Sequence, residues 1–250
     1  MTDPIPIRFT PALIIVDFQE DFCPPNGSLA VPDARSITPT INRLLSLPFA
    51  VRIATKDWHP ANHISFASNH PAPNNMPFTN EITITNPHNP SETQTTRLWP
   101  NHCVQHTSGA ALVPELDIDR VQHVVEKGQD PRVEMYSAFA DPFLSPTVSR
   151  SGLADMLRAA EVTHVFIVGL ALDYCVKFTA LDAAKEGFAT YVIAEGTKPV
   201  DPGAWADVGN TFAGNGVGLI REDSTMVDKV RNLGGKGAVL RDAEVPTVAL

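Results

Sequence analysis

The sequence predicts an α/β fold: a three-layer, doubly wound, six-stranded parallel sheet with helices on both faces. Two observations lead to this prediction. Short apolar runs alternate along the chain with longer segments of helical periodicity, as expected for parallel strands joined by crossover helices. The runs are also continuous rather than alternating, as in ALIIV at residues 12–16, which is typical of strands buried on both faces.

Six strands and five helices are expected in order. The strands are residues 12–16, 49–55, 121–125, 165–168, 191–194 and 217–220. The helices are residues 34–47, 151–160, 176–186, 204–213 and 224–233. Ile37, Ile41 and Leu44 lie at helical spacing in the first helix, which Pro48 ends. No internal repeat or second hydrophobic core is evident, so we expect one domain over residues 1–250.

The composition excludes several classes of protein. With 43% hydrophobic and 19% charged residues, the 250-residue chain can bury a core. Its 19 basic and 28 acidic residues give a net charge of −9 without a basic cluster, which argues against nucleic acid or an anionic membrane. Three cysteines are too few for a disulfide framework and indicate a reducing compartment, so we expect a cytoplasmic protein, with a nuclear or peroxisomal fraction left open. No signal peptide or membrane-spanning run is visible.

One long segment departs from the strand and helix pattern. Residues 60–100 contain seven prolines and seven asparagines and show no sustained periodicity. Connections in compact domains are usually ~4–6 residues long, so the segment needs an explanation. A disordered linker and an ordered insertion that covers a site both fit these observations.

Ionisable side chains follow four of the predicted strands. Asp17 follows the first strand, Asp57 and His59 the second, Lys127 the third, and Cys175 comes after a short loop from the fourth. Active sites of open parallel sheets lie beyond the carboxyl ends of the strands. We therefore expect these side chains to converge at one edge of the sheet.

Cys175, Lys127 and Asp17 together have the parts of a nucleophilic acyl-transfer site. Cys175 opens a predicted helix, where positive partial charge should lower the thiol pKa, and Lys127 should add to this effect. Asp17 would exchange protons, and the amides of Ala171 and Cys175 would form an oxyanion hole. The alternative to a catalytic role for Cys175 is that it is an inert buried cysteine. We assign that role to the other two cysteines, Cys23 and Cys103.

A second group of side chains is typical of a metal site. Asp57 and His59 are two residues apart, so on an extended segment they point to the same side. His102 lies at the end of the proline-rich segment, and His63 lies four residues beyond His59. Two imidazoles and a carboxylate with open positions suit one catalytic zinc ion or a similar divalent ion.

Six segments in order give the chain its family resemblance. They are DFQEDF (17–22), KDWHP (56–60), WPNHCV (99–104), EKG (126–128), YSAF (136–139) and GLALDYCV (169–176). With these, the chain resembles the nicotinamidase/pyrazinamidase branch of the isochorismatase-like cysteine hydrolases, particularly the fungal members. The resemblance implies the isochorismatase-like fold and hydrolysis of nicotinamide to nicotinate and ammonia in NAD salvage.

The resemblance also implies residue roles. Asp17, Lys127 and Cys175 correspond to the catalytic triad, and Asp57, His59 and His102 to the metal ligands, with His63 a ligand in some relatives only. The peptide bond between Leu170 and Ala171 is expected to be cis. Three aromatic residues are expected to wall the nicotinamide pocket: Phe22, Trp99 and Tyr136.

The predicted ligands decide between the two interpretations of residues 60–100. The segment begins after Asp57 and His59 and ends before His102. Because ligand atoms lie ~2 Å from a bound zinc ion, we predict an ordered flap that carries Trp99 to the substrate. Other functions stay open: hydrolysis of isochorismate or another small amide, or a non-catalytic metal-binding or redox-sensing role. A homo-oligomer also stays open.

Overall fold

The computed structural model describes residues 8–234 of the chain. Residues 1–7 and 235–250 lie outside the described part, and they include nearly all of the C-terminal segment 234–250, for which the sequence predicts no role. The described residues contain no helix long and apolar enough to cross a membrane.

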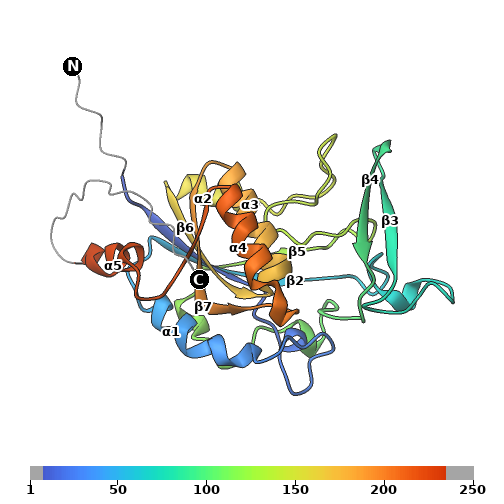
Figure 1. Ribbon diagram of the computed structural model, residues 1–250, viewed down its shortest axis with the longest axis horizontal. Helices are drawn as coiled ribbons and strands as arrows, with labels where there is room; N and C mark the ends of the chain where they lie inside the picture. The colour runs from blue at the N-terminus through green and yellow to red at the C-terminus, as the bar shows by residue number, and fades with distance from the viewer. Residues whose placement is uncertain (1–7, 235–250) are drawn as a thin grey trace.

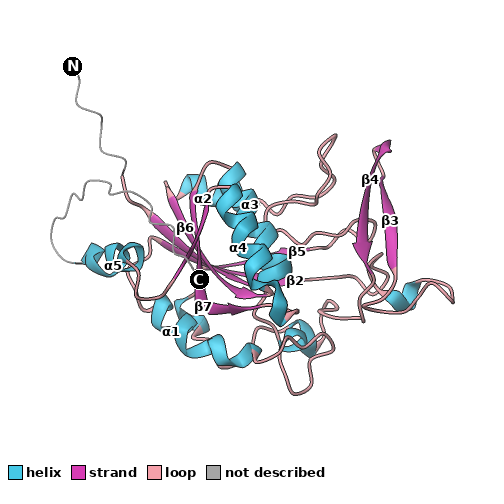
Figure 2. Cartoon of the chain, viewed as in Figure 1, coloured by secondary structure: helices cyan, strands magenta, loops and turns pink. Residues whose placement is uncertain are grey.

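The main sheet has six strands in the order β5-β2-β1-β6-β7-β8. They are β1 (Pro11–Val16), β2 (Val51–Asp57), β5 (His123–Lys127), β6 (His164–Leu170), β7 (Ala189–Lys198) and β8 (Val217–Ile220). Every neighbouring pair is parallel, and Figures 1 and 2 show the strands running together through the middle of the molecule. The predicted six-stranded parallel sheet is confirmed.

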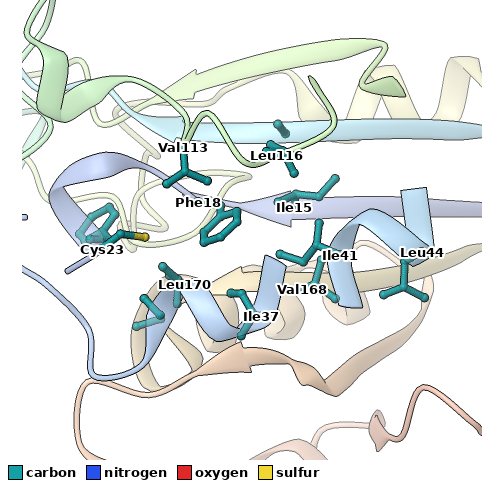
Figure 3. Close-up of a cluster of buried hydrophobic side chains, with 14 of the residues drawn as sticks. Ile15, Phe18, Cys23, Ile37, Ile41, Leu44, Val113, Leu116, Val168 and Leu170 are labelled. Atoms are coloured by element: carbon teal, nitrogen blue, oxygen red, sulfur yellow. The ribbon is translucent and has the colours of Figure 1, made fainter. Parts of the chain in front are cut away.

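Helices cover both faces of this sheet. The helices α1 (Thr38–Leu45) and α5 (Thr225–Arg231) pack on one face. The helices α2 (Leu153–Ala159), α3 (Lys177–Lys185) and α4 (Trp205–Gly214) pack on the other. Strand β1 serves both cores because its side chains alternate: Leu13 and Ile15 face α1, and Ala12 and Ile14 face the opposite layer. Figure 3 shows the first core, with Ile15 of β1 beside Ile41 of α1.

The element boundaries differ from the predicted ones in ways that matter near the site. A 3₁₀ turn, Ala34–Ile37, precedes α1. Strand β5 begins at His123, two residues later than predicted, and continues to Lys127. A π-helical turn, Leu172–Val176, precedes α3, so Cys175 lies inside this turn rather than at the start of a regular helix.

A second, two-stranded antiparallel sheet lies within the proline-rich segment and was missed by the sequence analysis. Its strands are β3 (Glu81–Asn86) and β4 (Asn89–Arg97). The pattern is weak because the hairpin buries little: Ile84 is buried with Val133 and Phe143 in a small separate cluster, whereas the threonines beside it are exposed. Figure 2 shows the hairpin standing apart from the main sheet.

Candidate active site and metal centre

The four strand-end residues meet around the side chain of Lys127. Asp17 follows β1, Asp57 ends β2, Lys127 ends β5, and Cys175 follows β6. The Lys127 Nζ atom is hydrogen-bonded to Asp57 Oδ1 and lies 3.0 Å from Asp17 Oδ2. It also lies 3.6 Å from Cys175 Sγ. All four side chains are buried, so the structure brings together the residues that the topology predicted to converge.

Thr55 and Gln19, which the sequence analysis did not single out, hold the two carboxylates in place. The Thr55 hydroxyl donates to Asp17 Oδ1 at 2.5 Å and accepts from the Asp17 N–H at 3.1 Å. The side-chain amide of Gln19 pairs with the backbone of Asp57 in both directions, each bond 2.8 Å long. Gln19 lies in the first motif and Thr55 near the second strand end, which are signals that could have found them.

Burial and charge set the protonation of the triad residues. Burial alone would lower the pKa of Lys127, but Asp17 and Asp57 raise it well above its ordinary value, so the ammonium is retained. Burial also raises the pKa of Asp17, although Lys127 opposes this. For the Cys175 thiol, burial raises the pKa well above its ordinary value, and Lys127 only partly offsets it. The expected lowering of the Cys175 pKa is therefore wrong: desolvation and two carboxylates outweigh the ammonium and the nearby helix.

Burial keeps the other two cysteines in the thiol form. Burial raises the pKa of Cys23 to about 12 and that of Cys103 well above its ordinary value. Both are fully buried and neither is in a disulfide bond. The Cys103 backbone N–H donates to Asp21 Oδ2 at 2.7 Å, which fixes the loop next to His102.

Asp57, His59 and His102 form a compact set of metal donors, with ligand atoms within 4.8 Å of one another. The Nδ1 atoms of both histidines donate to backbone carbonyls, that of His59 to Gly128 and that of His102 to Pro100, each at 2.8 Å. In the neutral form of each imidazole, Nε2 then carries the lone pair, and the two Nε2 atoms lie 3.5 and 3.9 Å from Asp57 Oδ2. The buried His59 Nε2 has no hydrogen-bond partner. One carboxylate and two oriented imidazoles fit a divalent ion such as zinc.

Gly128 allows His59 to take this position. Its φ is +69°, and a Cβ atom there would lie 2.5 Å from His59 Cε1. Any other residue would displace the imidazole that Gly128 also orients through its carbonyl.

His63 lies beside His59 but has no free ring nitrogen. Its Nε2 donates to the Val133 carbonyl at 3.1 Å, and its Nδ1 accepts from the Ser65 hydroxyl at 2.8 Å. Burial and the neighbouring His59 hold its pKa well below the ordinary value. Glu134, a buried carboxylate that the sequence analysis missed, has a ligand atom within 4.8 Å of atoms of both histidines.

An aromatic pocket with a volume of about 30 Å³ opens onto Cys175 and the metal donors. Phe22, Trp99 and Tyr136 line it, as does Ala171, which was predicted for the oxyanion hole, together with residues that were not predicted: Leu29, Val31, Tyr174 and Val200. The Trp99 Nε1–H donates to the Tyr136 hydroxyl at 2.9 Å, so the aromatic wall is held by a hydrogen bond. The Leu170–Ala171 peptide bond is cis, as expected.

Comparison with known proteins places this arrangement in a family. Residues 11–224 match the isochorismatase domain. The chain belongs to the isochorismatase family. Within this family it is 43% identical to a nicotinamidase of Acinetobacter baylyi over 190 residues, which are 76% of this chain and 82% of the relative.

Two solved structures of isochorismatase-family enzymes resemble the fold of the chain. Yeast nicotinamidase bound to the inhibitor nicotinaldehyde superposes with a TM-score of 0.78 at 34% identity, covering 84% of this chain and 99% of the yeast chain. A pyrazinamidase of Pyrococcus horikoshii in complex with zinc gives a TM-score of 0.64 at 34% identity, covering 85% and 99% of the two chains. The predicted family and fold class are confirmed, and the chain is an enzyme of this family.

Proposed function

We propose that the protein is a nicotinamidase that converts nicotinamide and water to nicotinate and ammonia in NAD salvage, with pyrazinamide as a second substrate. The observation that carries the proposal is the composition of one pocket. It presents the thiol of Cys175, with Lys127 and Asp17 behind it, at one point. It presents the donor atoms of Asp57 and His102 at another. A planar pyridine carboxamide has groups for both points.

The first half of the reaction forms a thioester on Cys175. The Asp17 carboxylate takes the proton of the thiol as the sulfur attacks the carboxamide carbon, and the Lys127 ammonium stabilises the thiolate as it forms. The backbone amides of Ala171 and Cys175 hold the oxyanion. Asp17 then returns the proton to the nitrogen, and ammonia leaves.

The second half regenerates the thiol. Asp17 takes a proton from a water molecule, whose oxygen attacks the thioester carbon. The C–S bond breaks, the sulfur recovers the proton, and nicotinate is released. A thiol with a raised pKa suits this cycle because one carboxylate, Asp17, receives and returns the same proton in each half.

Asp57, His59 and His102 would hold one divalent ion, most simply zinc, with His63 outside the ligand set because both of its ring nitrogens are hydrogen-bonded. When bound, the ion would supply a Lewis acid for the pyridine nitrogen and draw electron density from the ring. The chain's own contribution is to orient the two imidazoles through Gly128 and Pro100.

We further propose that residues 1–250 act as a single catalytic domain and that residues 60–100 form a flap. The β3–β4 hairpin and the Tyr136 bond to Trp99 support an ordered segment. Three free cysteines suit a reducing compartment such as the cytoplasm.

The proposal is tested by ammonia release from nicotinamide, pyrazinamide and a panel of other small amides, with isochorismate assayed in parallel. We expect nicotinamide and pyrazinamide to give the highest kcat/KM values. Nicotinamide among the poorest substrates would contradict the proposal and favour another hydrolysis. Absence of turnover on every substrate would favour a metal-binding or redox-sensing role.

The metal is tested separately by turnover before and after chelation, with metal analysis of the same samples. Full activity after verified metal removal would contradict the role of Asp57, His59 and His102.

A further inference from the structure

A second and larger hollow lies directly outside the aromatic pocket. This outer groove has a volume of about 450 Å³. Its walls come from the β3–β4 hairpin, through Arg97, and from the beginning of α3, through Lys177 and Phe178. Figure 1 shows the hairpin standing across from the layer that holds α3 and α4. The mechanism described above does not use the outer groove.

Among residues 8–234, the pocket and the outer groove share two lining residues, Tyr136 and Tyr174. Both residues therefore lie between the pocket and the groove, and together they form the partition between the two spaces. A substrate substituent that extends from the pocket toward the outer groove would have to pass this partition.

The two tyrosines are held very differently. The Tyr136 hydroxyl bonds to Trp99 Nε1 and to Thr96 Oγ1, each at 2.9 Å, and its ring stacks on Phe178 with centroids 5.5 Å apart. The Tyr174 hydroxyl has no hydrogen-bond partner among residues 8–234. The Tyr174 ring is held by an edge contact with Trp99 at 5.0 Å and a tilted contact with Tyr136 at 5.4 Å. Substitution of Tyr174 therefore breaks no side-chain hydrogen bond of the partition, whereas substitution of Tyr136 breaks two.

The proposed function, on which this inference rests, orients the substrate ring. The carboxamide at ring carbon 3 must reach Cys175, and the ring nitrogen must face Asp57 and His102. Carbon 5 is meta to both positions and so points away from both. The remaining wall of the pocket is apolar or aromatic, and Tyr136 and Tyr174 are the part of it that borders the outer groove.

We propose that Tyr174 is a specificity-determining residue that excludes carboxamides substituted at ring carbon 5. The outer groove is a subsite for a flat aryl substituent once Tyr174 is removed. Phe178, which is 37% exposed and stacks on Tyr136, supplies the aromatic surface on which such a group would stack.

The experiment compares kcat/KM for 5-phenylnicotinamide and nicotinamide, by ammonia release, in the wild type and three variants. The wild type should turn over the phenyl compound at least tenfold less efficiently. Tyr174→Ala should raise the ratio of phenyl compound to nicotinamide about 10- to 100-fold, the range for hydrophobic pocket discrimination. Tyr174→Phe, the matched control, should leave the ratio within about twofold. Tyr174→Leu also removes the ring from the partition but leaves a larger side chain than alanine to pack against Trp99 and Tyr136.

Three outcomes overturn the inference. The first is equal efficiency of the wild type on both compounds, which does not depend on any variant. The second is an unchanged ratio in Tyr174→Ala and Tyr174→Leu when both still hydrolyse nicotinamide. The third is a ratio that rises as much in Tyr174→Phe as in Tyr174→Ala. Failure of the wild type to hydrolyse nicotinamide would contradict the proposed function instead, so the two failures are distinguishable.

Discussion

The charged half and the aromatic half of the site are positioned by different means. Asp17, Asp57, Lys127 and Cys175 lie at or just beyond the ends of adjacent parallel strands. The aromatic half is carried by loops: Trp99 follows β4, whereas Phe22 lies in a 3₁₀ turn after β1. The charged side chains are held by ion pairs among residues at the strand ends of the main sheet. The aromatic wall is held by a hydrogen bond between two loops.

This difference separates two kinds of contribution. A strand end is fixed by the ladder of the sheet and by both cores, so the groups that react can be held in one geometry. Loop residues depend on a few long-range contacts, so they shape affinity and substrate choice. Changes in the charged half should therefore reduce kcat strongly, and changes in the aromatic half should mainly raise KM.

Removal of the proposed nucleophile should have the largest effect. We expect Cys175→Ala to lower kcat by on the order of 10⁴-fold or more, because the covalent route is lost. Cys23→Ala is the matched control, since Cys23 is a buried thiol with a pKa raised to about 12, and it should keep turnover within about twofold. Steady-state ammonia release measures both. Comparable losses in the two variants would mean that the charged half has no special role.

The Asp17→Asn variant should show the second largest effect. We expect kcat to fall about 10²- to 10⁴-fold, the range for loss of a general acid–base group. The carboxylate form of Asp17 is the active one, and burial raises its pKa. Wild-type activity should therefore fall as the pH decreases through a value above the ordinary range of an aspartate. A pH profile of kcat/KM checks this. An acid limb that persists unchanged in Asp17→Asn would assign it to another group.

The same contrast explains how much could be predicted from the sequence. Asp17, Asp57, Lys127 and Cys175 were predicted to meet because parallel topology brings strand ends to one edge. The protonation of Cys175 was predicted wrongly because depth of burial depends on the whole packed site. The hairpin was missed because only Ile82 and Ile84 carry an apolar alternation in β3, and β4 contains no Val, Ile, Leu or aromatic residue.

Residues that position other side chains were also not predicted from the sequence. Thr55 and Gln19 hold Asp17 and Asp57 across 38 positions of sequence. Their places in the first motif and near a strand end mark both residues as candidates, but the partner of each follows only from the pairing of β1 with β2. Tyr174 was inside a recognised motif, but its place between two hollows depends on the hairpin and α3.

Two buried histidines, His102 and His63, allow a metal ligand to be compared with a neighbouring histidine outside the ligand set. We expect His102→Ala to lower metal affinity at least tenfold, because it removes a donor with a free Nε2. His63→Ala should leave metal content unchanged and lower the free energy of unfolding by ~1–3 kcal/mol, because buried hydrogen bonds to Ser65 and Val133 are lost. Metal analysis after dialysis and thermal unfolding measure the two effects. Equal loss of metal in both variants would place His63 in the ligand set.

The smallest effect is expected in the aromatic half. Tyr136→Phe removes the hydroxyl that accepts from Trp99 Nε1 and bonds to Thr96. The loss of one such bond is worth ~1 kcal/mol, so KM should rise about fivefold while kcat changes less than twofold. Michaelis–Menten analysis with nicotinamide tests this. A large fall in kcat with constant KM would show that the wall takes part in the chemical steps.

The central claim is that Cys175 carries the acyl group during turnover. Intact-protein and peptide mass spectrometry after rapid acid quench of enzyme mixed with excess nicotinamide tests it most directly. We predict a mass increase equal to one nicotinoyl group, located on the peptide that contains Cys175 and absent from Cys175→Ala. A nicotinoyl group on another residue, or full single-turnover release of nicotinate with no adduct at any quench time, would contradict the account.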